Sequence, residues 1–435
     1  MNQNVNEELL VFLKESVTAF QAVNALRRCL NENGYEELTE GKQWQLKEGG
    51  KYFTVRNESS IIAFRIPEKD FAGFMIGASH SDSPAFKIKA NPEIKENGYI
   101  RLNVEKYGGA LLAPWFDRPL SVAGRVIVRE NGTFVTKYVN LERDFCMIPS
   151  LAIHMNRNAN KEGVESVQKE MLPVIGSEEC AGMFMKTVAE CAGVKEEDIL
   201  SHDLFLYIRE EGRIWGASGE YISAGHLDDL QCGFADLKGF LSADKSNSVP
   251  VFAVFDNEEV GSLSKQGANS TFLEDVLKRI AFACGKDHAG YMQAAANSFM
   301  VSADNAHAIH PAHAEKADPV NRPRMNQGIV LKYSANQKYT TDGISAAVFK
   351  EVCREAGVPV QEFVNHSDIA GGSTLGNLSN SHISLNAADI GLPQLAMHSC
   401  YETAGVKDTE YLIKAMQRFY SLTFTDEGSG KFSLK

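Results

Sequence analysis

The sequence predicts an α/β protein with a mixed, largely parallel, doubly wound sheet that is flanked by helices and carries an inserted β-rich domain. Short apolar runs alternate with helical patterns, which predicts the buried strands of the main sheet. Between residues 93 and 225, two-residue alternation and turn signals predict antiparallel strands instead. We therefore expect a main domain formed by residues 1–92 and 226–435, with residues 93–225 spliced into it.

Local patterns predict the individual elements. Residues 6–33 place apolar side chains at helical spacing, with a possible break at Ser16–Thr18. Residues 51–56 and 61–66 form a predicted β-hairpin, and Glu130-Asn-Gly-Thr133 is a strong type I′ turn signal. The remaining predictions are strands at 73–79, 99–104, 125–128, 204–208, 251–255, 299–303 and 328–333, and helices near 178–193, 273–284, 348–356 and 408–423.

The composition excludes several classes of partner. The chain has 435 residues, 44% of them hydrophobic, so it can form a sizeable core. Its net charge of -12 argues against nucleic acids and anionic membranes as partners, and no run approaches the roughly 18 apolar residues of a membrane span. The eight cysteines form no C-x-x-C pair and no signal peptide is evident, which predicts reduced thiols in a cytoplasmic protein.

The stretch from Val251 to Ser262 gives the first indication of function. An apolar run ends there in Asp256, Asn257, Glu258 and Glu259. Carboxylates beside a core must be paired, hydrogen-bonded or bound to a cation, although acids also suit the N-terminus of a helix. Two adjacent glutamates predict two roles, because one can bind a metal ion while the other transfers a proton.

Other predicted strands end in similar groups. His80 and Asp82 follow the run at 73–79, Asp304 follows the run at 299–303, and His398 ends a shorter run. Ligands of open α/β sheets bind beyond the carboxyl ends of the strands, so we expect these side chains at one edge. Histidines with carboxylates suit zinc, cobalt or manganese, and a two-metal site needs a bridging carboxylate, for which Asp228 is available.

Seven motifs occur in order over about residues 75–400: His80-Ser-Asp-Ser-Pro84, Tyr107-Gly-Gly with Trp115-Phe-Asp-Arg118, Ile148-Pro-Ser-Leu-Ala-Ile-His154, Leu227-Asp228, Asp256-Asn-Glu-Glu-Val-Gly-Ser262, Ser302-Ala-Asp-Asn-Ala-His-Ala-Ile-His-Pro311 and Gln394-Leu-Ala-Met-His398-Ser. In this order they resemble the aspartyl aminopeptidase family of co-catalytic zinc metallopeptidases. The chain departs from the family pattern at Ser16–Gln21, at Ala110 and Leu112, and at His226 and Asp229.

The resemblance implies two divalent metal ions, with zinc as the first expectation and cobalt or manganese as alternatives. It assigns His80 and Asp304 to one ion, Glu259 and His398 to the other, and Asp228 to both as the bridge. Two further carboxylates have implied roles beside these ligands: Asp82 orients the His80 imidazole, and Glu258 is the general base that takes a proton from the metal-bridging water.

The resemblance also implies an assembly and a substrate. In relatives, the histidine at the His154 position reaches into the active site of a neighbouring subunit of a tetrahedral homododecamer. Lys332 and Tyr339 match positions near the substrate, and a lysine there suits an acidic N-terminal residue; a structural ion pair is the alternative for Lys332. The expected activity is a metalloaminopeptidase that removes N-terminal residues, preferably Asp or Glu, from peptides.

Two other functions stay open at this point. The same metals can serve a related deacylase or carboxypeptidase, and a non-catalytic assembly particle would be expected to have lost the metal residues, which are intact here. His307 and His310 are interpreted as structural or as supporting the metal ligands. The glycine-rich stretch Gly371–Gly376 lacks the lysine of a P-loop, so we expect a wall near the substrate and not a phosphate site.

Overall fold

The computed structural model describes residues 2–67 and 70–435 and contains the expected α/β fold. Four neighbouring strands of its main sheet, β13, β4, β14 and β18, are parallel, and antiparallel pairs join them to both edges. The nine strands lie in the order β1 (Glu36–Glu37), β2 (Lys51–Arg56), β3 (Ser60–Arg65), β13 (Val249–Phe255), β4 (Phe74–His80), β14 (Phe299–Ala303), β18 (Asn386–Gly391), β16 (Ile329–Tyr333) and β17 (Val360–Val364).

Helices cover both faces of this sheet, which confirms the doubly wound prediction. Along β13, Phe252 and Val254 pack in one core cluster, while Val251 and Ala253 pack in the other. This two-residue alternation buries the strand completely, as its continuous apolar sequence predicts. The first face is covered by α2 (Ala19–Glu32), α5 (Leu227–Ser242), α8 (Gly343–Ala356) and α10 (Asp408–Tyr420), and the second by α6 (Phe272–Ala283), α7 (His288–Ala296) and α9 (Leu375–Ser379).

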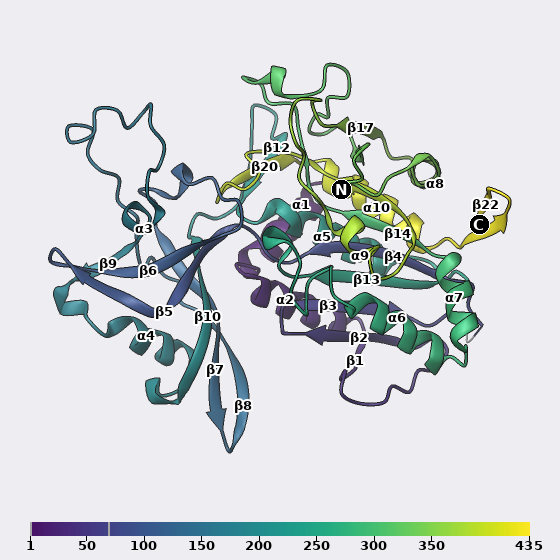
Figure 1. Ribbon diagram of the computed structural model, residues 1–435, viewed down its shortest axis with the longest axis horizontal. Helices are drawn as coiled ribbons and strands as arrows, with labels where there is room; N and C mark the ends of the chain where they lie inside the picture. The colour runs from purple at the N-terminus through teal and green to yellow at the C-terminus, as the bar shows by residue number, and fades with distance from the viewer. Residues whose placement is uncertain (1, 68–69) are drawn as a thin grey trace.

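A six-stranded sheet forms the β-rich part, which lies beside the main sheet on the left of Figure 1. Its order is β8 (Thr133–Asn140), β7 (Leu120–Glu130), β10 (Ile199–Ile208), β5 (Ala85–Glu96), β6 (Tyr99–Tyr107) and β9 (Val174–Ser177), with α3 (Val167–Glu170) and α4 (Met183–Ala192). Asn131 and Gly132 both have positive φ between β7 and β8, as the predicted type I′ turn requires. The first strand of this sheet, β5, begins at residue 85, before the predicted domain boundary at residue 93. The division of the chain into domains at 93 and 225 stays a prediction.

Smaller elements complete the fold. A five-stranded sheet has the order β11 (Arg213–Trp215), β12 (Tyr221–Ala224), β20 (Glu402–Gly405), β19 (Pro393–Leu395) and β15 (Ala306–His307), and β21 (Phe424–Gly428) pairs with β22 (Lys431–Leu434). The N-terminal helix breaks as anticipated, into α1 (Asn2–Glu15) and α2, and the predicted helix near 178–193 begins only at Met183. Each helix in the described ranges is too short or too polar to cross a membrane.

Candidate functional site

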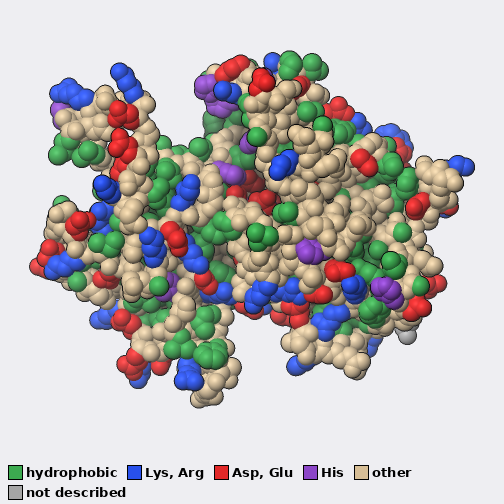
Figure 2. Space-filling view, in the orientation of Figure 1, with side chains coloured by type: hydrophobic (Ala, Val, Ile, Leu, Met, Phe, Trp, Pro, Cys, Tyr) green, Lys and Arg blue, Asp and Glu red, His purple; other side chains and the backbone are tan. Residues whose placement is uncertain are grey.

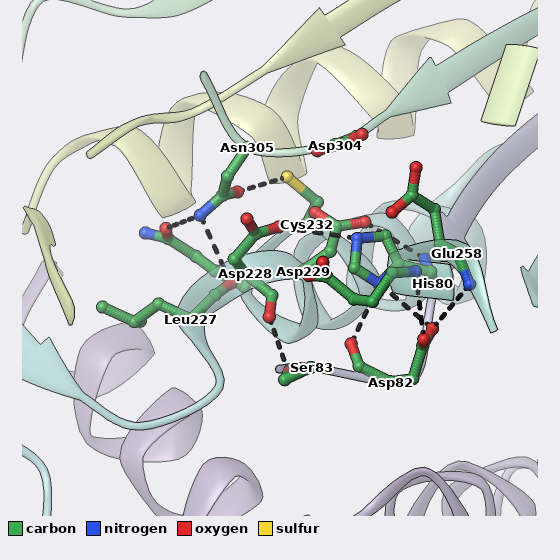
Figure 3. A network of polar contacts seen from close by, with 12 residues as sticks. His80, Asp82, Ser83, Leu227, Asp228, Asp229, Cys232, Glu258, Asp304 and Asn305 are labelled. Atoms are coloured by element: carbon green, nitrogen blue, oxygen red, sulfur yellow. Dashed lines mark hydrogen bonds and ion pairs between the residues drawn. The ribbon is translucent and has the colours of Figure 1, made fainter. Parts of the chain in front are cut away.

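The groups expected at one sheet edge meet there. His80 is the last residue of β4 and lies opposite Phe255 at the end of the parallel strand β13. Glu258 and Glu259 follow in a single 3-10 turn, η4 (Glu258–Val260), and Asp304 directly follows β14. Figure 3 shows His80, Glu258 and Asp304 around Asp228, which comes from the N-terminus of α5. Figure 2 shows acidic side chains recessed near the centre of the same view of the molecule.

Asp228 lies between the two predicted metal-binding histidines. Its Oδ1 is 3.5 Å from His80 Nε2, and its Oδ2 is 3.7 Å from His398 Nε2. His398 Nε2 is in turn 3.4 Å from Glu259 Oε2. The ligand atoms of Asp228, Glu259 and His398 lie within 4.8 Å of one another, as do those of His80, Asp228, Asp229 and Asp304. The two groups share Asp228, which is the arrangement that a bridging ligand between two adjacent ions requires.

Hydrogen bonds orient both imidazole rings. His80 Nδ1 is 2.9 Å from the backbone oxygen of Asp82, and His398 Nδ1 is 3.1 Å from the backbone oxygen of Gly109. When each Nδ1 carries its proton and donates it to that oxygen, both Nε2 atoms are free to bind a cation on the side of Asp228. The two rings are therefore held in the tautomer that a metal ligand needs.

The Asp82 carboxylate positions the turn that carries Glu258 and Glu259. Its Oδ1 accepts the backbone N–H of Glu258 at 3.1 Å, and its Oδ2 accepts that of Glu259 at 3.2 Å. The Tyr107 hydroxyl also donates to Oδ2, at 2.7 Å. Asp82 Oδ1 is 3.5 Å from His80 Nδ1, farther than its own backbone oxygen. Asp82 thus orients His80 mainly through its main chain, while its side chain holds both glutamates.

Two buried acids complete the support of the site, and the sequence did not single them out for it. Glu402 accepts the backbone N–H of His398 at 2.8 Å and that of Asp228 at 2.9 Å, so one carboxylate fixes residues from both metal groups. Asp229 Oδ2 accepts the His80 N–H at 3.1 Å. The Asp228-Asp229 doublet was visible in the sequence, but Glu402 carried no signal, because its partner Asp228 lies 174 residues away.

The electrostatics of the cluster favour bound cations. Burial, followed by the repulsion of neighbouring acids, raises the pKa of Glu259, and burial likewise raises the pKa of Asp229 and Asp304. Buried oxygens of Asp228, Asp229 and Glu259 have no hydrogen-bond partner among the described residues. Such a crowd of buried acids is costly unless a cation neutralises it, so the donor set fits divalent metal ions.

Glu258 stands beside the cluster with the properties of a proton acceptor and donor. Burial, only partly offset by His80, raises the pKa of its carboxyl group to about 8, and Asp304 and Asp82 act in the same direction. A group that exchanges protons works best when its pKa is near the working pH. The position therefore suits proton transfer at neutral pH.

Lys332 is buried beside Asp304. Its Nζ donates to the backbone oxygen of Asn305 at 2.8 Å, lies 3.6 Å from Asp304 Oδ1 and is 5.6 Å from the centre of the Tyr339 ring. Burial opposes the charge of this ammonium group, but Asp304 and other nearby acids raise its pKa, so it stays protonated. The ion-pair alternative for Lys332 therefore has a geometric basis, and contact with a substrate stays a prediction.

His154 lies away from these groups within the chain. It is exposed on the loop that leads from β8 toward α3, among the exposed side chains of Leu151, Ile153 and Met155. Figure 2 shows this loop projecting at the upper left. His310 and His313 are exposed neighbours with ring centres 5.1 Å apart. Burial lowers the pKa of His307; the charge of Lys332 acts in the same direction and that of Asp228 opposes it, so His307 lies near the site.

Comparisons with known proteins point to one family. The family model described as aminopeptidase I zinc metalloprotease (M18) matches residues 12–420. The chain is 46% identical to a probable M18 family aminopeptidase 2 from Clostridium acetobutylicum, over 96% of this chain and 98% of the relative. Among solved structures it resembles a chain of the Ape4 and Nbr1 complex (TM-score 0.94, 35% identity, 97% and 86% of the two chains). It also resembles the mApe1 dodecamer of S. cerevisiae (TM-score 0.84, 28% identity, 95% of each chain).

Proposed function

This chain belongs to the M18 family of zinc aminopeptidases, and from that premise we propose that it removes an acidic N-terminal residue from peptides with Glu258 as the general base. The observation that carries the proposal is that Asp228 lies between the buried His80 and the partly exposed His398, with Glu258 beside them. A non-catalytic particle would have no need for so many buried and mutually repelling acids.

We assign the metal residues as two sets joined by Asp228. His80 and Asp304 would hold one divalent ion, and Glu259 and His398 the other, with zinc as the expected metal. Bound in this way, the ions would polarise the scissile carbonyl group and lower the pKa of water in the site. The orphaned oxygens of Asp228 and Glu259 support the assignment, since each needs a positive partner.

Glu258 would carry the proton between the two reacting ends of the substrate. Its carboxylate accepts a proton from the attacking water and then donates it to the amine nitrogen as the peptide bond breaks. Asp82 keeps the carboxylate in place for both steps, because it holds the backbone N–H groups of Glu258 and Glu259. Burial of the Glu258 carboxyl group raises its pKa, which helps it to hold the proton until the amine leaves.

Lys332 and Tyr339 would provide the preference for acidic N-terminal residues. The support is a protonated ammonium group at the edge of the metal cluster, packed over the Tyr339 ring. Replacing Lys332 with Met should lower kcat/KM for aspartyl substrates by about 10-fold more than for alanyl substrates, because one charge-assisted contact is lost. An equal loss for both substrates would mean that Lys332 does not select acidic residues and serves only in its ion pair with Asp304.

Substrate class distinguishes this proposal from the related metal-dependent reactions. The purified protein should release amino acids from aminoacyl substrates and leave N-acylated and C-terminal substrates intact. Turnover of N-acyl substrates alone would identify a deacylase and refute the aminopeptidase assignment.

We further propose a cytoplasmic homo-oligomer, for which the tetrahedral dodecamer is the expected form. The exposed apolar side chains around His154 support a subunit contact there, and the buried thiols of Cys146, Cys232 and Cys353, which form no disulfide, are consistent with a reducing compartment. If His154 acts in a neighbouring subunit, oligomers that mix His154→Ala and Glu258→Gln chains should regain turnover that neither variant has alone. Mixed oligomers with no regained turnover would refute the action in trans.

A further inference from the structure

A separate cavity of about 270 Å³ lies behind the catalytic turn. Its lining comes mainly from the segment that joins α1 to α2 and begins α2, from the six-stranded sheet, and from the segments after β4 and β13. The five proposed metal ligands are absent from the described residues that line it. Its volume is at the lower end of the roughly 300–1,000 Å³ of small-molecule sites, so it can hold only a compact ligand.

One wall of the cavity is the network that holds Glu258 and Glu259. Tyr107 lines the cavity and donates to Asp82, while Asn257 Nδ2 donates to the Tyr107 hydroxyl at 2.8 Å. Asn257 directly precedes Glu258 and has positive φ, and its backbone N–H donates to Asp256 Oδ1 at 2.7 Å. A molecule in the cavity would therefore touch groups that set the position of the catalytic turn.

The charges in the cavity are arranged by depth. Asp82 and Asp256 at the inner end are only 4% and 5% exposed, and burial, followed by the charge of Asp82, raises the pKa of Asp256 to about 7. Lys87 is more exposed and pairs with Asp203 at 2.8 Å, and Arg125 binds the other oxygen of Asp203 at 3.0 Å. The cavity thus has acids at its inner end, whereas Lys87, Arg125 and Asp203 together leave a net positive charge farther out.

Apolar walls join these two ends. Phe20 lies under the Arg125 guanidinium group, 4.4 Å from ring centre to Arg125 Cζ, and Phe205 lies 5.6 Å from Lys87 Nζ. Val17 and Ala19 add aliphatic surface from the connection between α1 and α2. An apolar body between an anionic inner end and a cationic mouth matches a compact zwitterion with a hydrocarbon side chain.

We propose that this cavity binds a free α-amino acid with an apolar side chain and that its binding slows peptide hydrolysis. The ammonium group lies against Asp256, the side chain lies between Phe20 and Phe205, and the carboxylate faces Lys87 and Arg125. An ammonium group on Asp256 competes with the Asn257 N–H and so displaces the turn that carries Glu258. Free amino acids are products of the proposed reaction, so the interpretation of the inhibition as feedback by a product rests on the proposed function. The binding of the amino acid does not depend on it.

Calorimetry on the zinc-loaded oligomer tests the binding without turnover. With acetohydroxamate saturating the metal residues, L-leucine should still bind, whereas L-leucinamide and 4-methylpentanoate, which each lack one charged group, should bind at least about 10-fold more weakly. L-leucine that fails to bind up to its solubility limit, or that acetohydroxamate displaces, would overturn the proposal. Because no peptide is cleaved, this result is independent of the proposed reaction.

Two variants outside the catalytic residues locate the ligand. Ala19→Leu fills the cavity and Lys87→Met removes the mouth cation, so each should weaken L-leucine binding by about 10-fold, with Ala19→Ser as the matched control. Both should hydrolyse peptides at the normal rate without leucine and resist inhibition by it, and the wild-type inhibition should lower kcat while KM is unchanged. Unaltered leucine affinity in both variants, or purely competitive inhibition, would refute this location.

Discussion

Buried carboxylates occur in two regions of this molecule, and their surroundings differ. At the carboxyl edge of the main sheet, His80 shares candidate metal-binding groups with five acids, and three of these acids keep oxygens without a hydrogen-bond partner among the described residues. Below that edge, buried acids stand singly. Asp408 accepts the backbone N–H groups of Asn326 and Gly328 at 2.6 and 3.0 Å, and Asp236 accepts the Tyr420 hydroxyl at 2.8 Å.

The difference separates acids that need a cation from acids that serve the fold. A single buried carboxyl group can be satisfied by donors or take up a proton, at a modest cost. Five neighbouring acids repel one another, and this repulsion is relieved only when several of them take up protons or when a cation binds among them. The crowded region should therefore respond to metal removal, and the dispersed region should respond only to pH.

Removal of metal is expected to have the largest effect. Dialysis against a chelator should abolish peptide hydrolysis and lower Tm, because ions bound only to the folded state stabilise it and their loss restores the repulsion among the acids. Turnover and scanning calorimetry before and after chelation measure the effect, and added zinc should reverse it. Full turnover in protein shown to be metal-free would contradict the claim that the crowded acids need a bound cation.

The Glu258→Gln substitution should have the next largest effect. Glutamine keeps the shape of the side chain but cannot accept the proton, so kcat should fall by about 10²–10⁴-fold, the usual contribution of a general base. Zinc content should stay normal, since the metal ligands are unchanged; elemental analysis checks this, and the exposed Glu162→Gln is the matched control. Near-wild-type kcat would remove Glu258 as the base.

Glu402 tests whether an acid can belong to the metal region without binding a metal ion. In Glu402→Gln, the amide nitrogen must face the backbone N–H group of either Asp228 or His398, so one of these residues loses its hydrogen bond and the shared anchor is broken. Zinc affinity should fall by about 10–100-fold, as for other residues that orient metal ligands. Competition with a chromogenic chelator measures the affinity, with the exposed Glu427→Gln as control. Unchanged affinity would place Glu402 with the acids that serve the fold.

The sequence could predict the parts of the site that depend on local pattern. The runs before His80, Glu258 and Asp304 are apolar and continuous, so the strand ends were predictable, and parallel packing brings such ends together. The anchoring by Glu402 could not be predicted, because it joins residues that are distant along the chain.

Three strands of the main sheet were missed: β1, which has only two residues, and β17 and β18, which were missed because of their composition. β18 reads Asn386-Ala-Ala-Asp-Ile-Gly391, with small side chains and an internal acid, and β17 reads Val360-Gln-Glu-Phe-Val364, with polar residues at its centre. Neither has the apolar run that identified β13. The buried Asp389 in β18 instead accepts the hydroxyls of Thr340 and Thr374, each at 2.6 Å, and these partners cannot be inferred from spacing.

Asp236 gives the smallest expected effect and tests the dispersed region. Burial raises its pKa to about 8, against about 3.9 in an unfolded chain, so the folded protein holds an extra proton between these values. Its contribution to stability is complete below about pH 4 and is lost as the pH rises through 8. Asp236→Asn should therefore lose less Tm between pH 6 and pH 8 than the wild type does, while the exposed Asp244→Asn should behave like wild type. Equal losses of Tm in all three proteins would mean that Asp236 is ionised in the folded protein. Burial of one isolated carboxyl group would then not be enough to keep it protonated.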